Sequence, residues 1–288
     1  MFRNHIKIAW RKVKTQRFYA INNILGLAIG ISSCLLITLL VVDELSYDRF
    51  HEQAENIYRV AEDLQFNGER KEYTFSPALL ADALRSEEPE VIEAARFRTY
   101  GTQLLRRKGT LQNFKEDDVT YVDHEVFDIF TIPILEGDPA TVLKEPNTLV
   151  LTTSAAKRYF GNINPVGESM ILDDTETFRV VGVCEDLPAN SHFQYDVFLS
   201  TAGLNELQNA MWLSNNVVTY FLSRPNVDPV VLEEKANALF RKYAEPEMQK
   251  IAGMSIEEFE ASGNFLRYNL PPLTYNNIQS NIVGEQVV

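Results

Sequence analysis

Side chains of the kinds used in catalysis and metal binding are scattered along this sequence. The paired carboxylates Asp117–Asp118 and Asp173–Asp174 could act as general acid and base or bind calcium, but in a chain of net charge −13 such pairs are typical of solvated turns. The histidines stand too far apart for the short spacings of metal ligands on one helix or hairpin. They are His5, His51, His124 and His192. We therefore expect neither a metal site nor a catalytic centre.

Motifs for nucleotide and hydrolase chemistry are missing as well. No Gly-Lys-Ser or Gly-Lys-Thr occurs, so the sequence lacks a P-loop, and neither GxSxG nor HExxH is present. The two cysteines, Cys34 and Cys184, form no CxxC pair, and Cys34 lies too deep in an apolar run for a lipidation site. The sequence predicts a non-catalytic protein without a cofactor.

The element that must position everything else is an apolar segment near the N-terminus. Ile21–Val42 contains no charged residue and would span about 33 Å as a helix, enough for a hydrocarbon core of about 30 Å. A cleaved signal peptide is the alternative, but it would have a shorter apolar core that ends at a small-residue cleavage site. We predict an uncleaved transmembrane helix over residues 18–42.

Charge is distributed unequally on the two sides of this helix. Residues 1–42 carry only basic charges, whereas all 40 acidic residues follow Val42. By the positive-inside rule, the N-terminus is cytoplasmic and residues 43–288 lie outside the inner membrane. The acidic outer part would repel phosphate, which argues against nucleic acid as a partner.

Small and polar residues share one face of the predicted membrane helix. Gly26 and Gly30 form a GxxxG pattern, and Asn22 and Ser33 fall on about the same face. This pattern favours a seam for packing against other helices. Chance is the alternative, because glycine is common in membrane helices.

The cytoplasmic segment, residues 1–17, mixes apolar and basic side chains. Phe2, Ile6, Trp10 and Val13 recur every three or four residues among Lys and Arg. This spacing predicts an amphipathic helix that lies in the inner membrane interface. A plain positively charged anchor explains the same residues.

The part of the chain beyond the membrane helix has mixed helix and strand signals, with an antiparallel bias. Residues 43–56 are predicted to continue the helix as a stalk, before a strand that begins near Ile57. Asn67–Gly68 between two strand-like runs predicts a hairpin turn. Ser76 is predicted to cap a helix whose first position is Pro77.

The middle of the chain alternates strands and helices. A helix capped by Thr153 or Ser154 and ended by Gly161 follows the strand-like run "NTLVL". Further strand-like runs come after it. The sequence therefore predicts an α+β fold, with one N-terminal transmembrane helix and an extracytoplasmic domain over residues 57–288.

Four stretches, taken in order, resemble the permease subunits of MacB/FtsX-type ABC transporters. A fifth, "LPPLTYNNIQS", is similar to the segment that precedes the second membrane helix in that family. The four stretches are "MFRNHIKIAWRKVKTQRFYAINNILGLAIGISSCLLI", "DELSYDRFHEQAENIYRV", "YVDHEVFDIFTIPILEGDP" and "LVLTTSAAKRYFGNINPVGESMILDDTETFRVVGVCEDLPANSHFQYDVFLS".

The resemblance implies a particular division of the outer domain. Porter-like split βαβ elements would occupy approximately residues 57–100 and 215–275. An inserted sabre-like subdomain would occupy residues 101–214. Residues 43–56 would be the stalk that joins this domain to the membrane helix.

The resemblance also implies a function. The chain would be the N-terminal part of a permease subunit that couples a separate cytoplasmic P-loop ATPase to the outer domain by mechanotransmission, for export of lipoproteins, peptides or amphiphilic compounds. Phe2 to Val13 would contact the ATPase. A permease dimer and a periplasmic adaptor or outer-membrane partner would complete the system.

One departure from the family keeps a second hypothesis open. The family has further membrane helices after the outer domain, and this sequence ends at Val288 without one. We expect a fragment of a longer permease, with a truncated product as the alternative. From a different class, a single-pass membrane protein with a self-contained ligand- or partner-binding outer domain fits the same sequence.

Overall fold

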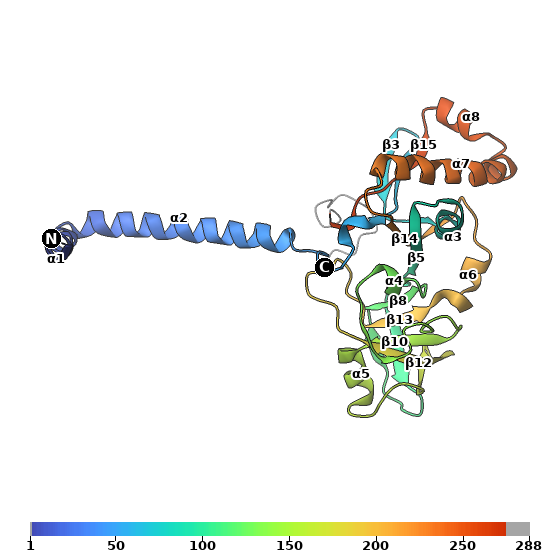
Figure 1. Cartoon of the computed structure of the whole chain (residues 1–288), viewed down its shortest axis with the longest axis horizontal. Coiled ribbons are helices and arrows are strands. Elements are labelled where there is room, and N and C mark those ends of the chain that lie inside the picture. Colours follow the sequence, from blue (N-terminus) through green and yellow to red (C-terminus); the bar gives the residue numbers. More distant parts are fainter. Residues whose placement is uncertain (1, 275–288) are drawn as a thin grey trace. The chain divides into compact units, whose positions relative to one another are not determined.

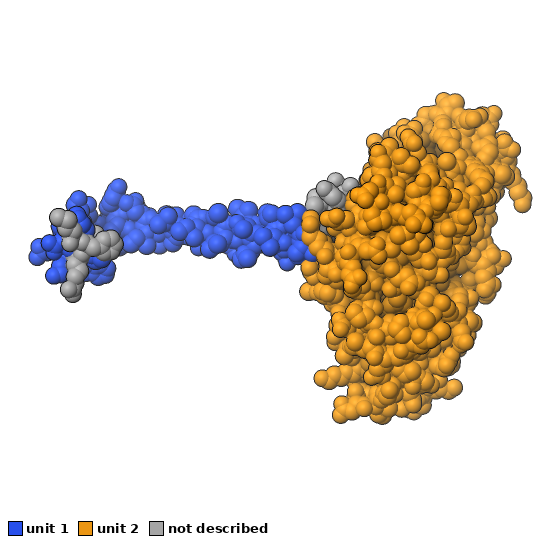
Figure 2. Space-filling model, in the orientation of Figure 1, with its two compact units in different colours: residues 1–46 blue, residues 47–288 orange. Residues whose placement is uncertain are grey.

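The computed structural model describes residues 2–274, with the chain divided into two compact units, Met1–Ser46 and Tyr47–Val288 (Figures 1 and 2). We refer to them as the membrane unit and the outer unit. The predicted "LPPLTYNNIQS" segment and the predicted porter-like range to residue 275 extend beyond the described residues.

The membrane unit consists of two helices, α1 (Phe2–Thr15) and α2 (Arg17–Glu44). Within the described chain, α2 is the one helix that is long and apolar enough to cross a membrane, and none of its residues is buried. An apolar helix without a protein core around it is stable where lipid replaces that core. The predicted helix over residues 18–42 is therefore present in the structure.

The prediction that α2 continues as a helical stalk is wrong, because α2 ends at Glu44. Turns follow, and a short 3₁₀ helix, η1 (Ala54–Asn56), leads into strand β1 (Ile57–Arg59). Asp48 adopts a left-handed backbone with φ of 58° and is fully buried. Tertiary contacts made by this residue outweigh the helical pattern of the sequence.

The outer unit is built on one 12-stranded sheet with the order β1-β14-β5-β8-β13-β10-β12-β11-β6-β7, to which β4 and β9 are attached at the side. Most pairs are antiparallel, and β10–β12 and β8–β13 are parallel. The predicted α+β fold with an antiparallel bias is confirmed. The bounds are β4 (Ser76–Pro77), β5 (Val91–Arg98), β6 (Gln103–Arg107), β7 (Phe114–Glu116), β8 (Val119–Val122), β9 (Ile134–Gly137), β10 (Thr148–Thr152), β11 (Ser169–Leu172), β12 (Glu176–Cys184), β13 (Val197–Ser200) and β14 (Asn215–Ser223).

A second sheet of three strands has the order β15-β2-β3, with β2 (Ala61–Phe66), β3 (Glu69–Tyr73) and β15 (Phe265–Asn269). The predicted hairpin turn between β2 and β3 is confirmed. Asn67 and Gly68 have φ of 52° and 83°, the positive values that a two-residue type I′ turn requires.

Helices cover the sheets, and two of their predicted N-caps are wrong. The helix after β4 begins at Ala78 with Pro77 at the cap position, because the buried Ser76 hydroxyl donates instead to Thr219 Oγ1 at 2.8 Å. The helix after β10 is capped by Thr152, one residue earlier than expected. The helices are α3 (Ala78–Glu87), α4 (Val126–Ile129), α5 (Thr153–Phe160), η2 (Thr201–Gly203), α6 (Asn205–Gln208), α7 (Pro229–Ala252) and α8 (Ile256–Ala261).

The core lies on both faces of the large sheet. On one face, Phe221 of β14 packs in a cluster with buried residues of α3 and α7, the two helices that lie beside this end of the sheet in Figure 1. On the other face, Tyr220 of β14 and Phe97 of β5 pack with Phe130 and Phe193. Successive residues of a strand point to opposite faces, so β14 supplies both clusters.

Candidate functional site

The chain that follows α2 is fixed to the outer unit by a buried carboxylate. We call Tyr47–Gln53 the connecting segment. The Asp48 amide donates to the carbonyl oxygen of Asn190 at 2.9 Å, and the His192 amide donates to Asp48 Oδ1 at 3.0 Å. Asp48 Oδ1 also lies 2.8 Å from Nδ1 of His192, whose Nε2 lies 2.7 Å from the Tyr220 hydroxyl. A chain of hydrogen bonds thus joins the connecting segment to β14.

A second attachment in the same segment is made by His51. The Thr131 amide donates to His51 Nδ1 at 3.1 Å, and the Glu52 amide donates to Thr131 Oγ1 at 2.9 Å. Burial lowers the pKa of His51 to about 4, with the Asp48 charge opposing that shift. His51 is therefore a neutral hydrogen-bond acceptor at neutral pH, and its ring packs edge-on against Phe130 at 5.0 Å between centroids.

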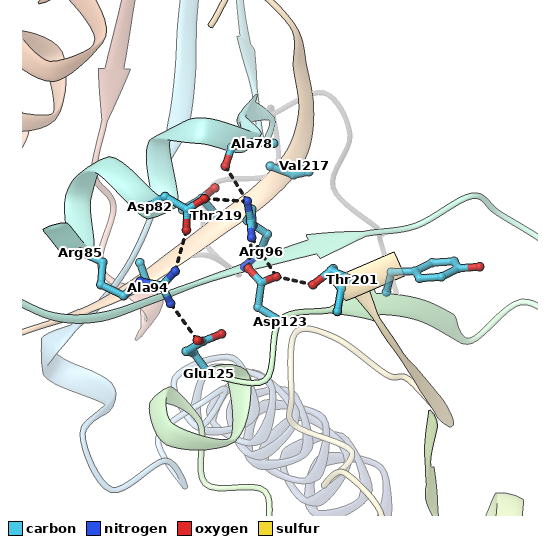
Figure 3. Close-up of polar contacts among 12 residues, drawn as sticks. Ala78, Asp82, Arg85, Ala94, Arg96, Asp123, Glu125, Thr201, Val217 and Thr219 are labelled. Carbon is cyan, nitrogen blue, oxygen red and sulfur yellow. Dashed lines mark hydrogen bonds and ion pairs between the residues drawn. The ribbon is translucent and has the colours of Figure 1, made fainter. Parts of the chain in front are cut away.

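A group of charged side chains connects α3, β5 and the turn after β8 (Figure 3). We call Asp82, Arg85, Arg96, Asp123 and Glu125 the charged junction. Arg96 donates from Nε to Asp123 Oδ2 at 2.7 Å and from Nη2 to Asp123 Oδ1 at 3.1 Å, a paired geometry that fixes both side chains. Both side chains are largely buried, at 14% and 6% exposure.

The junction extends from this pair to the neighbouring elements. Arg96 Nη1 donates to the carbonyl oxygen of Ala78 at 3.1 Å, and the Thr201 hydroxyl donates to Asp123. Arg85 of α3 pairs with Glu125 at 2.8 Å, as well as with Asp82 and Glu93. Figure 3 shows these side chains converging from the helix, the sheet and the turn. The largely buried Arg96–Asp123 pair thus joins β5 to the turn after β8, and the more exposed Arg85 and Asp82 extend these contacts to α3.

The predicted helix-packing residues lie on one side of α2. Asn22, Gly26, Gly30 and Ser33 fall within an arc of about 80° at 100° per residue, and all four are exposed. A Cβ added at Gly26 or Gly30 would meet no atom within 4 Å. The face is therefore open to a partner helix, and packing through it stays a prediction.

The predicted interfacial residues all belong to α1. Ile6, Trp10 and Val13 are 57%, 63% and 41% exposed, and Phe2 precedes Ile6 by one helical turn. The basic side chain of Lys14 lies over the Trp10 ring at 5.8 Å from its centroid. The predicted helix over this segment is present as α1, whereas its position in the membrane interface and its contact with an ATPase stay predictions.

The carboxylate pairs singled out in the sequence lie in turns and at strand edges. Asp173 and Asp174 have φ of 46° and 59°, Asp173 Oδ1 accepts from the Leu104 amide at 2.8 Å, and Asp174 pairs with Arg106 at 3.0 Å. Within residues 2–274, no group of three or more His, Cys, Asp and Glu side chains could hold a metal ion.

The sequence patterns did not single out Asp48, Arg96 or Asp123. Their partners are far away along the chain, for example 144 residues between Asp48 and His192. The one local signal was the dense run of charged and aromatic residues in "DELSYDRFH", which a helical stalk explained equally well.

Comparisons with known proteins agree with this architecture. The family model for the MacB-like periplasmic core domain matches residues 20–239, more than half of the chain. A domain of a protein described as a permease from Porphyromonas gingivalis has a TM-score of 0.62 at 24% identity, covering 77% of this chain and 91% of that chain. This likeness shows a shared fold.

Two further solved structures are more distant. The periplasmic region of MacB from Actinobacillus actinomycetemcomitans has a TM-score of 0.48 at 17% identity and covers 73% of this chain and 92% of that chain. The extracellular domain of the noncanonic ABC-type transporter YknZ from Gram-positive bacteria has a TM-score of 0.49 at 9% identity, with 75% and 100% covered. A search of curated proteins found no match.

Proposed function

We propose, from the premise that this chain belongs to the family of MacB-like periplasmic core domains, that it transmits force in an ABC-type exporter. The family is one of transporter permeases, and the chain joins such a domain to a helix that is long enough to cross a membrane. In this proposal, α1 contacts a cytoplasmic ATPase and α2 carries its movement across the inner membrane to the outer unit.

The observation that carries the proposal is the way in which the connecting segment enters the outer unit. A displacement of α2 reaches that unit through Tyr47, and the next residue, Asp48, is fully buried and bonded to His192. His51 and Glu52 add two bonds to Thr131. The connecting segment itself belongs to the outer unit, so in this proposal a displacement that reaches Tyr47 along the chain acts directly on these buried bonds.

The charged junction supports the same proposal inside the outer unit. Arg96 belongs to the predicted porter-like part and Asp123 to the predicted sabre-like part, and their two parallel hydrogen bonds join the parts directly. We propose that this connection makes the two parts move together.

The exported compounds in this proposal would be lipoproteins, peptides or amphiphilic molecules. The exporter would contain a permease dimer and an adaptor or outer-membrane partner.

Coupling to the ATPase can be tested at α1. We expect Phe2→Asp, Ile6→Asp and Trp10→Asp, made together, to abolish any change in ATP turnover that the chain causes in a co-reconstituted cytoplasmic ATPase. Acidic groups on the apolar face would detach the helix from the interface. Turnover would be measured in nanodiscs that contain both proteins.

Ile8→Asp is the matched control, since Ile8 is 59% exposed and lies away from the face shared by Ile6 and Trp10. This variant should keep normal coupling. If the triple variant stimulates the ATPase as well as the unaltered chain does, α1 has no coupling role.

A further inference from the structure

Three basic side chains of α1 have no acidic partner within the part of the chain that the structure describes. Lys7, Arg11 and Lys14 are all exposed, and none of them forms an ion pair there. The first acidic residues of the sequence, Asp43 and Glu44, stand at the far end of α2, a helix about 42 Å long. The charge of α1 therefore favours an anionic partner from outside the membrane unit.

These three side chains, which we call the basic stripe, lie beside the apolar face of α1. At about 100° per residue, Lys7, Arg11 and Lys14 fall within an arc of about 60°, and the edge of this arc lies about 40° from Trp10. Lys12 stands on the other flank, about 160° from Trp10. An apolar face with basic side chains on both flanks is typical of a helix in a membrane interface, because long basic side chains reach from it to the headgroups.

The backbone between the two helices allows α1 to leave the direction of α2. Gln16 has φ of −113° and ψ of 55°, values outside the helical range, so the helix is interrupted at this residue. Tyr19, in the first turn of α2, is 70% exposed. Tyr and Trp are enriched where membrane helices meet the headgroups. The position of Tyr19 therefore favours a headgroup level at the end of α2 that adjoins α1.

We propose that α1 binds the surface of an anionic phospholipid bilayer, through its basic stripe and its apolar face together. The apolar side chains would enter the boundary of the acyl chains, and the basic stripe would lie among the negatively charged headgroups. One basic side chain near such a surface favours binding by about fivefold, so the stripe as a whole favours anionic over zwitterionic lipid by about 100-fold. This selection of lipid goes beyond the coupling role of α1.

A bilayer fits these features better than the acidic surface of a protein does. The basic stripe and the apolar face are adjacent, so a partner must offer negative charge and apolar depth side by side, as an anionic bilayer does along its whole surface. The helix that follows is apolar over its length and has no buried residue. Lipid around α2 would thus continue along α1.

The test uses Trp10 as a reporter in the full chain. Trp212→Phe leaves Trp10 as the only tryptophan. The protein would be placed, without any ATPase, in nanodiscs of phosphatidylcholine alone or with about 30% phosphatidylglycerol. We expect acrylamide to quench Trp10 about threefold less in the anionic nanodiscs, with emission at shorter wavelength. Salt at about 1 M, where the screening length is about 3 Å, should remove this difference.

Neutralising the basic stripe should abolish the protection of Trp10 in anionic nanodiscs. The variant carries Lys7→Gln, Arg11→Gln and Lys14→Gln, and glutamine keeps a helix propensity close to that of Lys and Arg. A second variant, with Lys7→Arg, Arg11→Lys and Lys14→Arg, keeps the charges and should keep the protection. Circular dichroism of both variants would establish that their helix content is unchanged.

The matched control removes the same number of charges from the outer unit. Three exposed lysines there are changed to glutamine, and Trp10 should stay protected as in the unaltered chain. They are Lys108, Lys115 and Lys144. Loss of protection in this control would mean that net charge alone, rather than the basic stripe, decides the binding.

Three further results would overturn the proposal. Equal quenching of Trp10 in the two kinds of nanodisc would exclude a selection for anionic lipid, and protection kept by the glutamine variant of α1 would exclude the basic stripe. Protection that appears only after the ATPase is added would make a protein surface the partner. Coupling is measured separately as ATP turnover, so a failure here would leave the proposed function standing.

Discussion

At the scale of single residues, the connecting segment depends on side chains held in one protonation state. His51 accepts a hydrogen bond from the Thr131 amide through Nδ1, and only an unprotonated nitrogen can accept. Protonation of His51 would break this bond and place a charge in a buried site beside Phe130. Acidification should therefore weaken the attachment of the segment.

The direction in which stability changes with pH follows from the pKa of His51 in the folded and the unfolded chain. The pKa is lowered from 6.5 to about 4 by burial, so between these values the unfolded chain binds more protons than the folded chain. Stability that is fully present above pH 6.5 is lost as the pH falls toward 4. The shift corresponds to about 3 kcal/mol at most.

We predict that His51→Asn removes this contribution, because an amide oxygen can accept from Thr131 and does not titrate. The free energy of unfolding would be compared between the unaltered protein and the variant at pH 7.5 and 4.5. Trp212, which is 7% exposed, reports unfolding of the outer unit in a Trp10→Phe background. If the stability of the two proteins had the same pH dependence, protonation of His51 would not be the cause of the loss at acidic pH.

At the scale of elements, the charged junction carries a second prediction. Arg96→Met leaves the Asp123 carboxylate, which is 6% exposed, without its paired cation. Breaking a buried ion pair by removal of one partner typically costs about 3–5 kcal/mol. We expect a loss of that size in urea unfolding, because α3, β5 and the turn after β8 lose their common contact.

The exposed pair of Arg179 and Glu145 is the matched control. These side chains are 55% and 71% exposed and lie 2.8 Å apart, so Arg179→Met should change the free energy of unfolding by less than about 1 kcal/mol. A double variant, Arg96→Met with Asp123→Leu, should recover part of the loss. Equal effects of Arg96→Met and Arg179→Met would show that the junction is not a cross-link.

The small-residue face of α2 gives a prediction about assembly. Gly26→Leu with Gly30→Leu would fill that face and prevent the close helix approach that glycine allows. We expect association of the chain in nanodiscs, measured by energy transfer between labelled copies, to fall at least fivefold. Ala28→Leu on the opposite side of α2 should have little effect, and equal association of all variants would exclude this face as a seam.

At the scale of the whole molecule, the predicted topology needs a reporter that solvent can reach. Cys184 is unsuitable, because it is fully buried and burial raises the pKa of its thiol to about 12. Leu111 is 99% exposed in the loop between β6 and β7. Leu111→Cys with Cys34→Ser places one reactive thiol on the outer unit.

We predict that a membrane-impermeant maleimide added to the outside labels the Leu111→Cys variant in intact spheroplasts from which inside-out vesicles have been removed. A second variant carries Lys12→Cys on α1 together with Cys34→Ser and keeps Leu111. It should be labelled only after the membrane is opened. The unequal distribution of basic and acidic residues on the two sides of α2 is the physical reason. The reverse pattern of labelling would show that the chain has the opposite orientation in the membrane.

Local patterns were sufficient for the parts of this protein whose stability is local. The apolar run of α2, the spacing of Phe2, Ile6, Trp10 and Val13, and the Asn67–Gly68 turn are each visible within a few residues. Their physical causes, which are lipid exposure, amphipathic periodicity and a positive φ, act over the same short distances. The α+β fold and the family resemblance followed from such elements in order.

Tertiary structure decided the rest, because the relevant partners are distant along the chain. Asp48 ends the expected stalk by folding back to His192, 144 residues away, and Ser76 is taken from its expected cap by Thr219 on β14. Arg96 and Asp123 meet only when β5 pairs with β8. The sequence by itself determined which segment forms a helix long and apolar enough to cross a membrane and that an α+β domain follows it, whereas the long-range pairing of the strands decided which polar groups are buried together.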